Sequence, residues 1–191
     1  MADKNVDNLI TALQEINVLV GEWYENNLPK IGDLIEDLLI TAYLTGREAA
    51  EDYLEYRLET EADIDLLNKA LNLKIEGETY RDRINKYLEE GGTAYDFTRI
   101  AETEFHRMYN TGLVDGGNEI GYETGEYITK TWVAVMDDRT RDQHAYLDGM
   151  TIPLNDLFYT YECDSSYAPG MFVKAYLDVN CRCVLTLSKF N

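Results

Sequence analysis

The sequence predicts an α+β fold, in which a mostly α-helical N-terminal two-thirds is followed by a small C-terminal β-containing module. Before about residue 125, apolar residues recur at three- and four-residue spacing, as they do along one face of a helix. After about residue 130, short runs rich in β-branched and aromatic side chains replace this pattern. Hydrophobic residues make up 45% of the 191 residues, which is enough to bury a core.

The helical part is expected to begin with one amphipathic helix over residues 6–27. Pro29 then marks a break or the start of a new helix, because proline fixes φ and has no N–H to donate. A long helical stretch follows over residues 31–75. Within it, Gly46 indicates a bend or a helix end, and the polar run at 59–65 fits either a helix surface or a turn.

Further helices are expected before the pattern changes. Residues 78–88 form a short amphipathic helix that the glycine pair at 91–92 ends. Thr93 is placed to cap the next helix, and Gly112 closes that helix. Residues 113–125 are predicted as another short helix.

The C-terminal module is predicted to contain short strands around one small helix. Residues 131–135 and 182–187 have the β-branched and apolar composition of strands. Residues 140–147 form one or two helical turns between them. Residues 150–153 form a short extended piece, which Pro153 restricts to the edge of a sheet because proline cannot donate a ladder hydrogen bond.

The charge of the chain limits the partners that it can bind. The formal net charge is −19 and the isoelectric point is near 4.3. Such a field repels phosphate backbones, so direct nucleic-acid binding is not expected, whereas a basic partner surface would be attracted. A plain solvated acidic surface explains the same charge. There is no run of eighteen apolar residues and no basic and then apolar leader, so we expect no membrane span and synthesis in the cytoplasm.

Two cysteines near the end of the sequence form a candidate metal site with a histidine. Cys181 and Cys183 are two residues apart, so a strand presents both sulfur atoms on one face. With His144 and a fourth ligand such as Cys163 or Asp142, they have the chemistry of a tetrahedral zinc site. The alternative is that both cysteines are small core residues and that His144 is a hydrogen-bonded structural histidine. A disulfide between residues so close on one strand closes poorly.

A charged segment links the first predicted strand to the small helix. It contains Asp137, Arg139, Thr140, Arg141 and Asp142. In one interpretation it is a polar turn that fixes the angle between strand and helix, with Thr140 capping the helix. In the other, its arginines bind a phosphate.

A second group of polar residues lies on the helix that follows Thr93. Arg99, Glu102, Glu104 and His106 fall at helical spacing, which favours ion pairs between Arg99 and Glu102 and between Glu102 and His106 over acid–base or metal chemistry. No glycine-rich phosphate loop follows a predicted strand, and no Gly-x-Ser-x-Gly sequence is present. We therefore expect a protein that is not an enzyme.

The order and spacing of the polar and aromatic residues in the second half of the chain resemble the phage Mu protein F family. Members of this family are minor head or head morphogenesis proteins of tailed bacteriophages. The residues that carry the resemblance are Arg99, Thr103, Glu104, Lys130, Trp132, Asp137, Arg139, Arg141, His144, Asp148, Gly149, Asn180, Cys181, Arg182 and Cys183.

The resemblance implies a minor capsid protein of a phage or prophage, made in the bacterial host cytoplasm and located in the virion head. Such a protein binds the portal, the major capsid protein or the scaffold during head assembly, and some members are thought to leave with the DNA. Residues 1–92 then form a helical region that is a candidate for docking, and residues 93–191 form the head morphogenesis module. No cofactor is implied other than the candidate zinc.

The resemblance leaves a second function open. Some family members are fused to toxin domains, so a prophage-derived enzyme or effector on the same scaffold is the alternative. Its chemistry would come from His144, Cys181 and Cys183.

Overall fold

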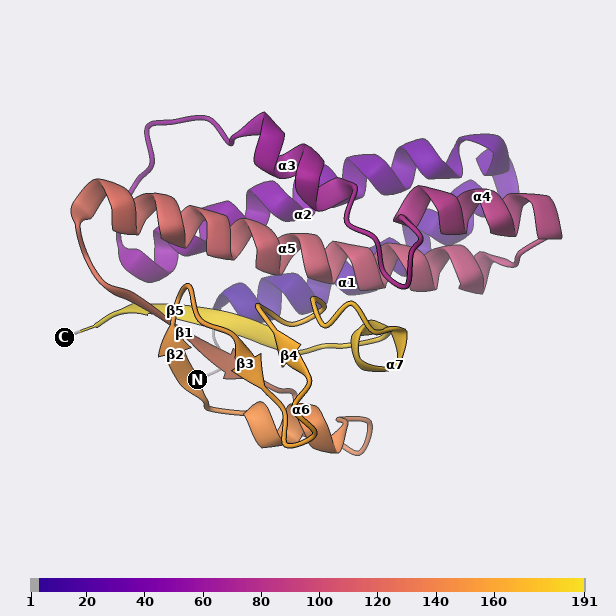
Figure 1. The fold of residues 1–191 in the computed structure, drawn as a ribbon. Coiled ribbons are helices and arrows are strands. Elements are labelled where there is room, and N and C mark those ends of the chain that lie inside the picture. The colour runs from indigo at the N-terminus through magenta and orange to yellow at the C-terminus, as the bar shows by residue number, and fades with distance from the viewer. Residues whose placement is uncertain (1–3, 191) are drawn as a thin grey trace.

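The computed structural model describes residues 4–190, with side chains from residue 11, and shows a layer of helices packed on a smaller layer of strands (Figure 1). The helices are α1 (Lys4–Asn27), the 3-10 turn η1 (Leu28–Lys30), α2 (Ile31–Leu54), α3 (Ile64–Leu71), α4 (Tyr80–Glu90), α5 (Ala94–Thr124), α6 (Asp142–Leu147) and α7 (Ala175–Asp178). The strands are β1 (Ile128–Val133), β2 (Thr151–Pro153), β3 (Phe158–Tyr159), β4 (Ser165–Ser166) and β5 (Val184–Lys189). The predicted α+β class is confirmed.

The helix predicted over residues 31–75 is in fact two helices joined by a turn. Helix α2 ends where Glu55 adopts the left-handed conformation, with a φ of 49°. Helix α3 begins after Asp63, whose carboxylate accepts hydrogen bonds from the N–H groups of Asp65 and Leu66 at 2.8 and 3.3 Å. The polar run at 59–65 is therefore mostly a turn that ends in a helix cap.

The predicted end of α4 at the glycine pair and the predicted start of α5 at Thr93 are confirmed. Before α4, the N–H of Thr79 donates to the Asp82 carboxylate at 2.9 Å, and its hydroxyl group accepts from the Asp82 N–H. After α4, Gly91 has a φ of 77°, a conformation that glycine adopts without steric cost. Thr93 and Asp96 repeat the capping arrangement at the start of α5.

Two glycines that the sequence indicated as helix breaks lie instead inside helices, where α2 and α5 touch. A Cβ atom on Gly46 would lie 2.0 Å from the backbone oxygen of Tyr109, and one on Gly112 would lie 1.9 Å from the backbone oxygen of Tyr43. The two backbones are so close that no side chain fits between them. Helix α5 consequently runs unbroken for 31 residues, and the separate helix predicted over residues 113–125 does not exist.

Helix α5 belongs to the helical layer and also contacts the sheet. It packs against α1, α2 and α4 on one side and against β1 and β5 on the other. At Gly117 the sheet reaches the helix, since a Cβ atom there would meet the Leu187 side chain at 2.7 Å. One continuous hydrophobic core includes residues from both sides of α5. The division at residue 92 stays a prediction.

The main sheet has the strand order β2-β1-β5, with both pairs antiparallel. In the central strand, Trp132 lies opposite Leu185 and is fully buried. Pro153 lies in the edge strand β2, as predicted. Strands β3 and β4 form a separate two-stranded hairpin, which the sequence pattern did not predict. Within residues 4–190, no helix combines the length and apolar character that crossing a bilayer requires.

The close approach of α2 and α5 generates a stability prediction. Replacing Gly112 with alanine should lower the free energy of unfolding by about 1–3 kcal/mol, because the helices must separate to admit the methyl group. Urea unfolding followed by circular dichroism measures this change.

Gly21→Ala is the matched control in α1, where no atom lies within 4 Å of the added Cβ. This variant should gain up to about 1 kcal/mol from the higher helix propensity of alanine. Equal effects of the two substitutions would contradict the steric explanation.

Candidate functional site

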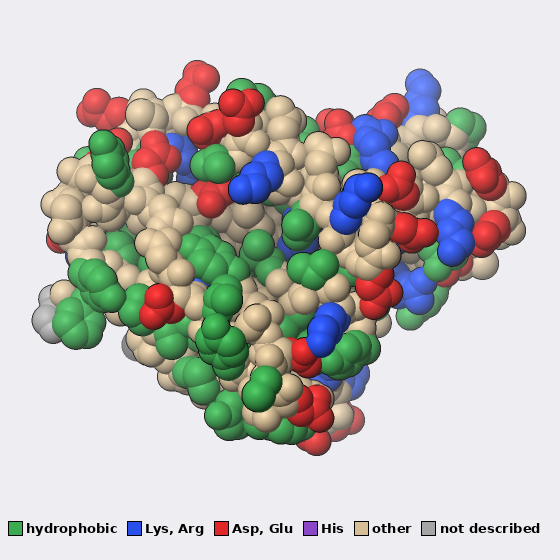
Figure 2. Space-filling view, viewed as in Figure 1, with side chains coloured by type: hydrophobic (Ala, Val, Ile, Leu, Met, Phe, Trp, Pro, Cys, Tyr) green, Lys and Arg blue, Asp and Glu red, His purple; other side chains and the backbone are tan. Residues whose placement is uncertain are grey.

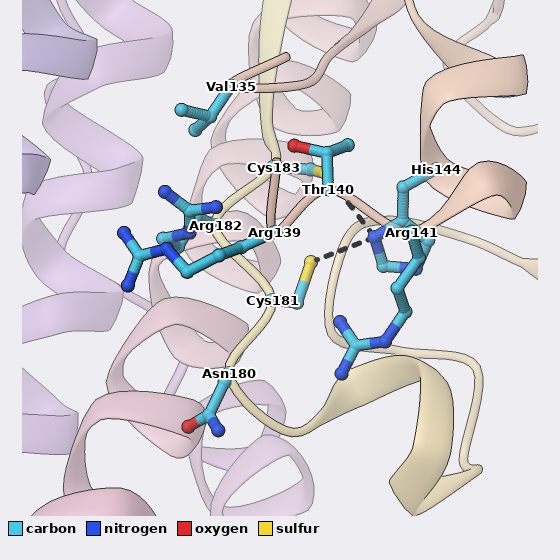
Figure 3. Close-up of a pocket in the computed structure, with 9 residues that line it drawn as sticks. All are labelled: Val135, Arg139, Thr140, Arg141, His144, Asn180, Cys181, Arg182 and Cys183. Atoms are coloured by element: carbon cyan, nitrogen blue, oxygen red, sulfur yellow. Dashed lines mark hydrogen bonds between the residues drawn. The ribbon is translucent and has the colours of Figure 1, made fainter. Parts of the chain in front are cut away.

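The candidate site brings His144 of α6 next to the two cysteines that precede β5. The Nδ1 atom of His144 lies 3.5 Å from Sγ of Cys181 and 3.4 Å from Sγ of Cys183. All three side chains are buried, and their potential ligand atoms lie within 4.8 Å of one another. Figure 3 shows His144 reaching toward the cysteines from its helix, with the sulfur of Cys181 turned toward the imidazole ring.

The fourth ligands considered from the sequence do not complete this cluster. Among the described residues, the group of potential metal ligands contains only the histidine and the two cysteines. Cys163 is exposed, and Asp142 is the first residue of α6 but is not in the group.

Aromatic rings surround the histidine. The ring of His144 stacks on Phe172 with a centroid distance of 5.6 Å, and it meets the edge of Trp132 at 5.7 Å. Phe158 packs against the other side of Trp132. The Nε2 atom of His144 has no hydrogen-bond partner among the described residues. The ring is therefore positioned by packing and by its Nδ1 contacts.

The two thiols differ in acidity because one donates to the other. The hydrogen bond to Cys183 and burial raise the pKa of Cys181. The same hydrogen bond, accepted by Cys183, lowers the pKa of Cys183, and the indole N–H of Trp132 adds to this effect. The Trp132 N–H has no hydrogen-bond partner among the described residues, so the contact with Cys181 is the main cause of the lower pKa of Cys183. Cys183 is the better thiolate, but it is buried, and no described residue bonds to Nε2 of His144 to orient that ring for nucleophilic catalysis.

The charged segment after β1 is tied to the cysteine segment. The Arg182 guanidinium donates to both carboxylate oxygens of Asp137 at 2.6 and 2.5 Å, which holds the pKa of that carboxyl below its usual range. Thr140 does not cap α6; its hydroxyl bonds back to Asp137 at 3.3 Å. Arg141 donates to the backbone oxygen of Val179 at 2.5 Å. These contacts favour the structural interpretation of the turn over phosphate binding.

A small depression opens above the cluster. It has a volume of about 10 Å³, close to that of a single water molecule. Its lining comes from three segments of the chain: Val135, Arg139, Thr140, Arg141, His144, Asn180, Cys181, Arg182 and Cys183.

Two further motif residues have positive φ angles near the depression. Asn180 has a φ of 57°, and Gly149, with a φ of 72°, donates its N–H to the Trp132 oxygen at 2.8 Å. Most of the predicted motif residues thus lie in or beside the lining of the depression, a region that we call the corner.

Glu104 and Arg99 lie outside this corner, on α5. Glu104 is fully buried and bonds to Arg83 at 2.5 Å and to Arg107 at 2.7 Å, and these two arginines lower its pKa against the effect of burial. Arg107 is also buried and donates to the Ala70 oxygen at 2.9 Å. Sequence reasoning missed both arginines. Arg107 stands three residues after Glu104 and was detectable, but Arg83 comes from α4 and no local pattern points to it.

The ion pairs predicted along α5 do not form between the expected residues; Arg99 instead lies 3.6 Å from the Asp96 carboxylate. Arg99 donates to the Tyr87 hydroxyl at 2.8 Å, and Glu102 accepts from Asn17 of α1. His106 is buried, with Asn110 beside it, and burial lowers its pKa to about 4. The expected pairing of Glu102 with His106 is wrong, because Glu102 is bonded to Asn17 of α1, whereas His106 contacts Asn110 one turn further along α5.

Lys130 is a buried cation of the central strand. Its Nζ donates to the Tyr167 oxygen at 2.7 Å and lies 3.7 Å from the centre of the Tyr167 ring. Burial lowers the pKa of Lys130 to about 7.

Glu104→Gln tests the buried ion network. The substitution leaves Arg107 buried without a counter-charge, so the free energy of unfolding should fall by about 3 kcal/mol. Glu102→Gln on the same helix is the matched control and should leave stability within about 0.5 kcal/mol of the wild type. If the free energy of unfolding fell as much in Glu102→Gln as in Glu104→Gln, the loss would not come from the buried ion network.

The lowered pKa of Lys130 predicts that the free energy of unfolding depends on pH. Because the folded pKa of about 7 lies below the ordinary value, the unfolded chain binds more protons above that pH, and stability rises as pH increases from about 7 to about 9. Urea unfolding of Lys130→Met should lack this part of the rise, whereas Lys189→Met on β5 should retain it. Parallel pH curves for all three proteins would show that Lys130 does not titrate in this range.

Comparison with known proteins identifies the family. The family model described as phage Mu protein F like protein matches residues 66–186, which is well over half of the chain. The NAD(+)–arginine ADP-ribosyltransferase EFV of Enterococcus faecalis is 32% identical over 146 residues, covering 76% of this chain and 29% of that protein. The minor head protein GP7 of Bacillus phage SPP1 is 34% identical over 85 residues, covering 44% of this chain and 27% of that protein.

The chain spans less than a third of the length of either relative. No solved structure matches it. The family match covers α4, α5, strands β1 and β2, the first half of β5 and the corner that holds the motif residues, as the resemblance in the sequence led us to expect. The chain belongs to the phage Mu protein F-like family.

Proposed function

We propose that this chain is a head morphogenesis module that acts in the virion head by binding other head proteins, with no catalysis of its own. The observation that carries the proposal is the family match over residues 66–186. The similarity to a protein named minor head protein GP7 supports it. The partners proposed are the portal, the major capsid protein and the scaffold of the same phage.

The way in which the motif residues are used supports a binding role over an enzymatic one. Asp137 bonds to Arg182, Arg141 bonds to a backbone oxygen, and Glu104 is enclosed by arginines. These polar groups stabilise the fold and do not converge on a cleft that would hold a substrate. The surface that recognises a partner must then be made of other, exposed residues.

An exposed aromatic surface near the β3–β4 hairpin is the contact surface that we propose. We define this aromatic surface by Tyr146, Tyr159 and Tyr161, which are each more than half exposed. Tyr146 and Tyr161 meet edge to face with centroids 5.7 Å apart. Figure 2 shows apolar side chains gathered over the strand layer, while acidic and basic side chains are more frequent over the helices. Exposed tyrosines are favourable contact residues, because a rigid ring and a hydroxyl group serve one interface.

The net charge of −19 indicates what kind of partner surface would meet this module. Its field attracts basic protein surfaces and repels packaged DNA. The proposed partner surface is therefore basic at its rim, around a site that accepts the tyrosine rings.

The double substitution Tyr146→Ser and Tyr161→Ser tests the aromatic surface. Binding to the purified portal, capsid and scaffold proteins would be measured by surface plasmon resonance. The variant should bind its partner at least about tenfold more weakly, because loss of a central aromatic contact costs more than about 1.4 kcal/mol. Tyr122→Ser is the matched control. This side chain is 91% exposed in the last turn of α5, outside the aromatic surface, and the variant should bind like the wild type.

Mass spectrometry of purified heads tests the function as a whole. The protein should be present in heads and should co-purify with at least one of the three proposed partners. Absence from heads together with no measurable binding to any of the three partners would overturn the proposal.

A second function is favoured by one observation, the similarity over 146 residues to a protein named as an ADP-ribosyltransferase. An enzyme using His144 and the two cysteines would need its substrate to reach them. The depression above these residues holds only about 10 Å³, far less than the several hundred Å³ of an ordinary ligand pocket. We therefore place this function second.

Incubation with labelled NAD and an arginine-rich acceptor protein distinguishes the two functions. We expect no transfer of label by the wild-type protein. Transfer that the wild type catalyses and His144→Asn does not would replace the binding function with the enzymatic one.

A further inference from the structure

We propose that His144, Cys181 and Cys183 bind one zinc ion, which joins α6 to the segment that precedes β5. The proposal goes beyond the binding function above and does not depend on it. It rests on the spacing of three ligand atoms, on their burial and on the depression beside them.

The spacing of the ligand atoms is that of a tetrahedral zinc site. Zinc–sulfur bonds of about 2.3 Å and a zinc–nitrogen bond of about 2.0 Å place neighbouring sulfur and nitrogen ligands about 3.5 Å apart at a tetrahedral angle. The observed separations between Nδ1 of His144 and the two sulfur atoms are 3.5 and 3.4 Å. These two separations match the tetrahedral geometry, and all three ligand atoms lie within 4.8 Å of one another, close enough for one ion to bridge them.

The chemistry of the three ligands selects the metal. Two thiolates and one neutral imidazole compensate the charge of a divalent ion, so the bound group is neutral within a buried environment. Sulfur and nitrogen ligands favour zinc over calcium and magnesium, which prefer oxygen. The indole N–H of Trp132 is buried and has no hydrogen-bond partner among the described residues, so a donor remains free near the cluster.

The depression completes the coordination. The described residues offer three ligands, so the fourth position opens into the depression between Thr140 and Asn180. Its volume of about 10 Å³ accepts a water molecule but no substrate. The zinc ion is accordingly structural, although its fourth ligand comes from solvent.

A bound zinc ion would strengthen a connection that two other contacts already make between α6 and the cysteine segment. The Asp137–Arg182 pair and the Arg141–Val179 hydrogen bond already connect the same two segments. Both of these contacts lie at or near the surface, where water competes with them. A zinc ion held by buried ligands would link the segments independently of salt and would fix the angle between α6 and β5.

Metal content is measured by inductively coupled plasma mass spectrometry on tag-free protein expressed with zinc in the medium. Wild-type protein should contain about one zinc ion per chain. Cys181→Ser and Cys183→Ser should each reduce the zinc content at least about fivefold. Cys163→Ser is the matched control, since this exposed cysteine is outside the cluster, and it should retain full zinc content.

A second measurement uses only proteins that fold. Wild-type and Cys163→Ser proteins are stripped with a chelator, and zinc is then returned at about a hundredfold excess over its dissociation constant. The melting temperature should rise by roughly 5 °C or more, because zinc binds only the folded chain. Cobalt in place of zinc should give the absorption bands of a cobalt–thiolate centre.

The proposal would be overturned if wild-type protein contained no zinc, its melting temperature did not respond to added zinc, and cobalt gave no thiolate absorption. The same result would leave the binding function above intact, because that function is tested on the aromatic surface. The cluster would then be a hydrogen-bonded group of two core thiols and an imidazole.

Discussion

The close contact between α2 and α5 is the constraint on which the rest of the structure depends. Gly46 and Gly112 allow the two backbones to touch, and the contact fixes α5 in the middle of the molecule. The sheet then packs on the opposite side of α5, where Gly117 admits the side chain of Leu187. Each glycine costs roughly 1 kcal/mol of helix propensity, which the packing of two large apolar layers on one helix offsets.

The elements that could be predicted from the sequence are those whose signal is local. Helix caps such as Thr93, the strand around Trp132 and the edge position of Pro153 each follow from a few neighbouring residues. The error at Gly112 arose because a glycine that breaks a helix and a glycine that admits another helix look the same in a single sequence. The partners of Glu104 were hidden for a similar reason, since Arg83 is brought to it from another helix by tertiary packing.

The candidate site was more accessible to sequence reasoning than the core. The residue types and order of His144, Cys181 and Cys183 marked them as a group, and the structure places their ligand atoms together. Their surroundings could not be predicted, because the stacking of Phe172 and the small size of the depression depend on loops without regular patterns.

The continuity of α5 has a geometric consequence. At 1.5 Å per residue, its 31 residues form a rod about 46 Å long. One end is capped beside α4, and the other passes through Gly125 almost directly into the central strand β1. Figure 1 shows this helix extending across nearly the whole molecule. Because only residues 125–127 separate α5 from β1, the C-terminal end of this rod sets directly where the central strand begins.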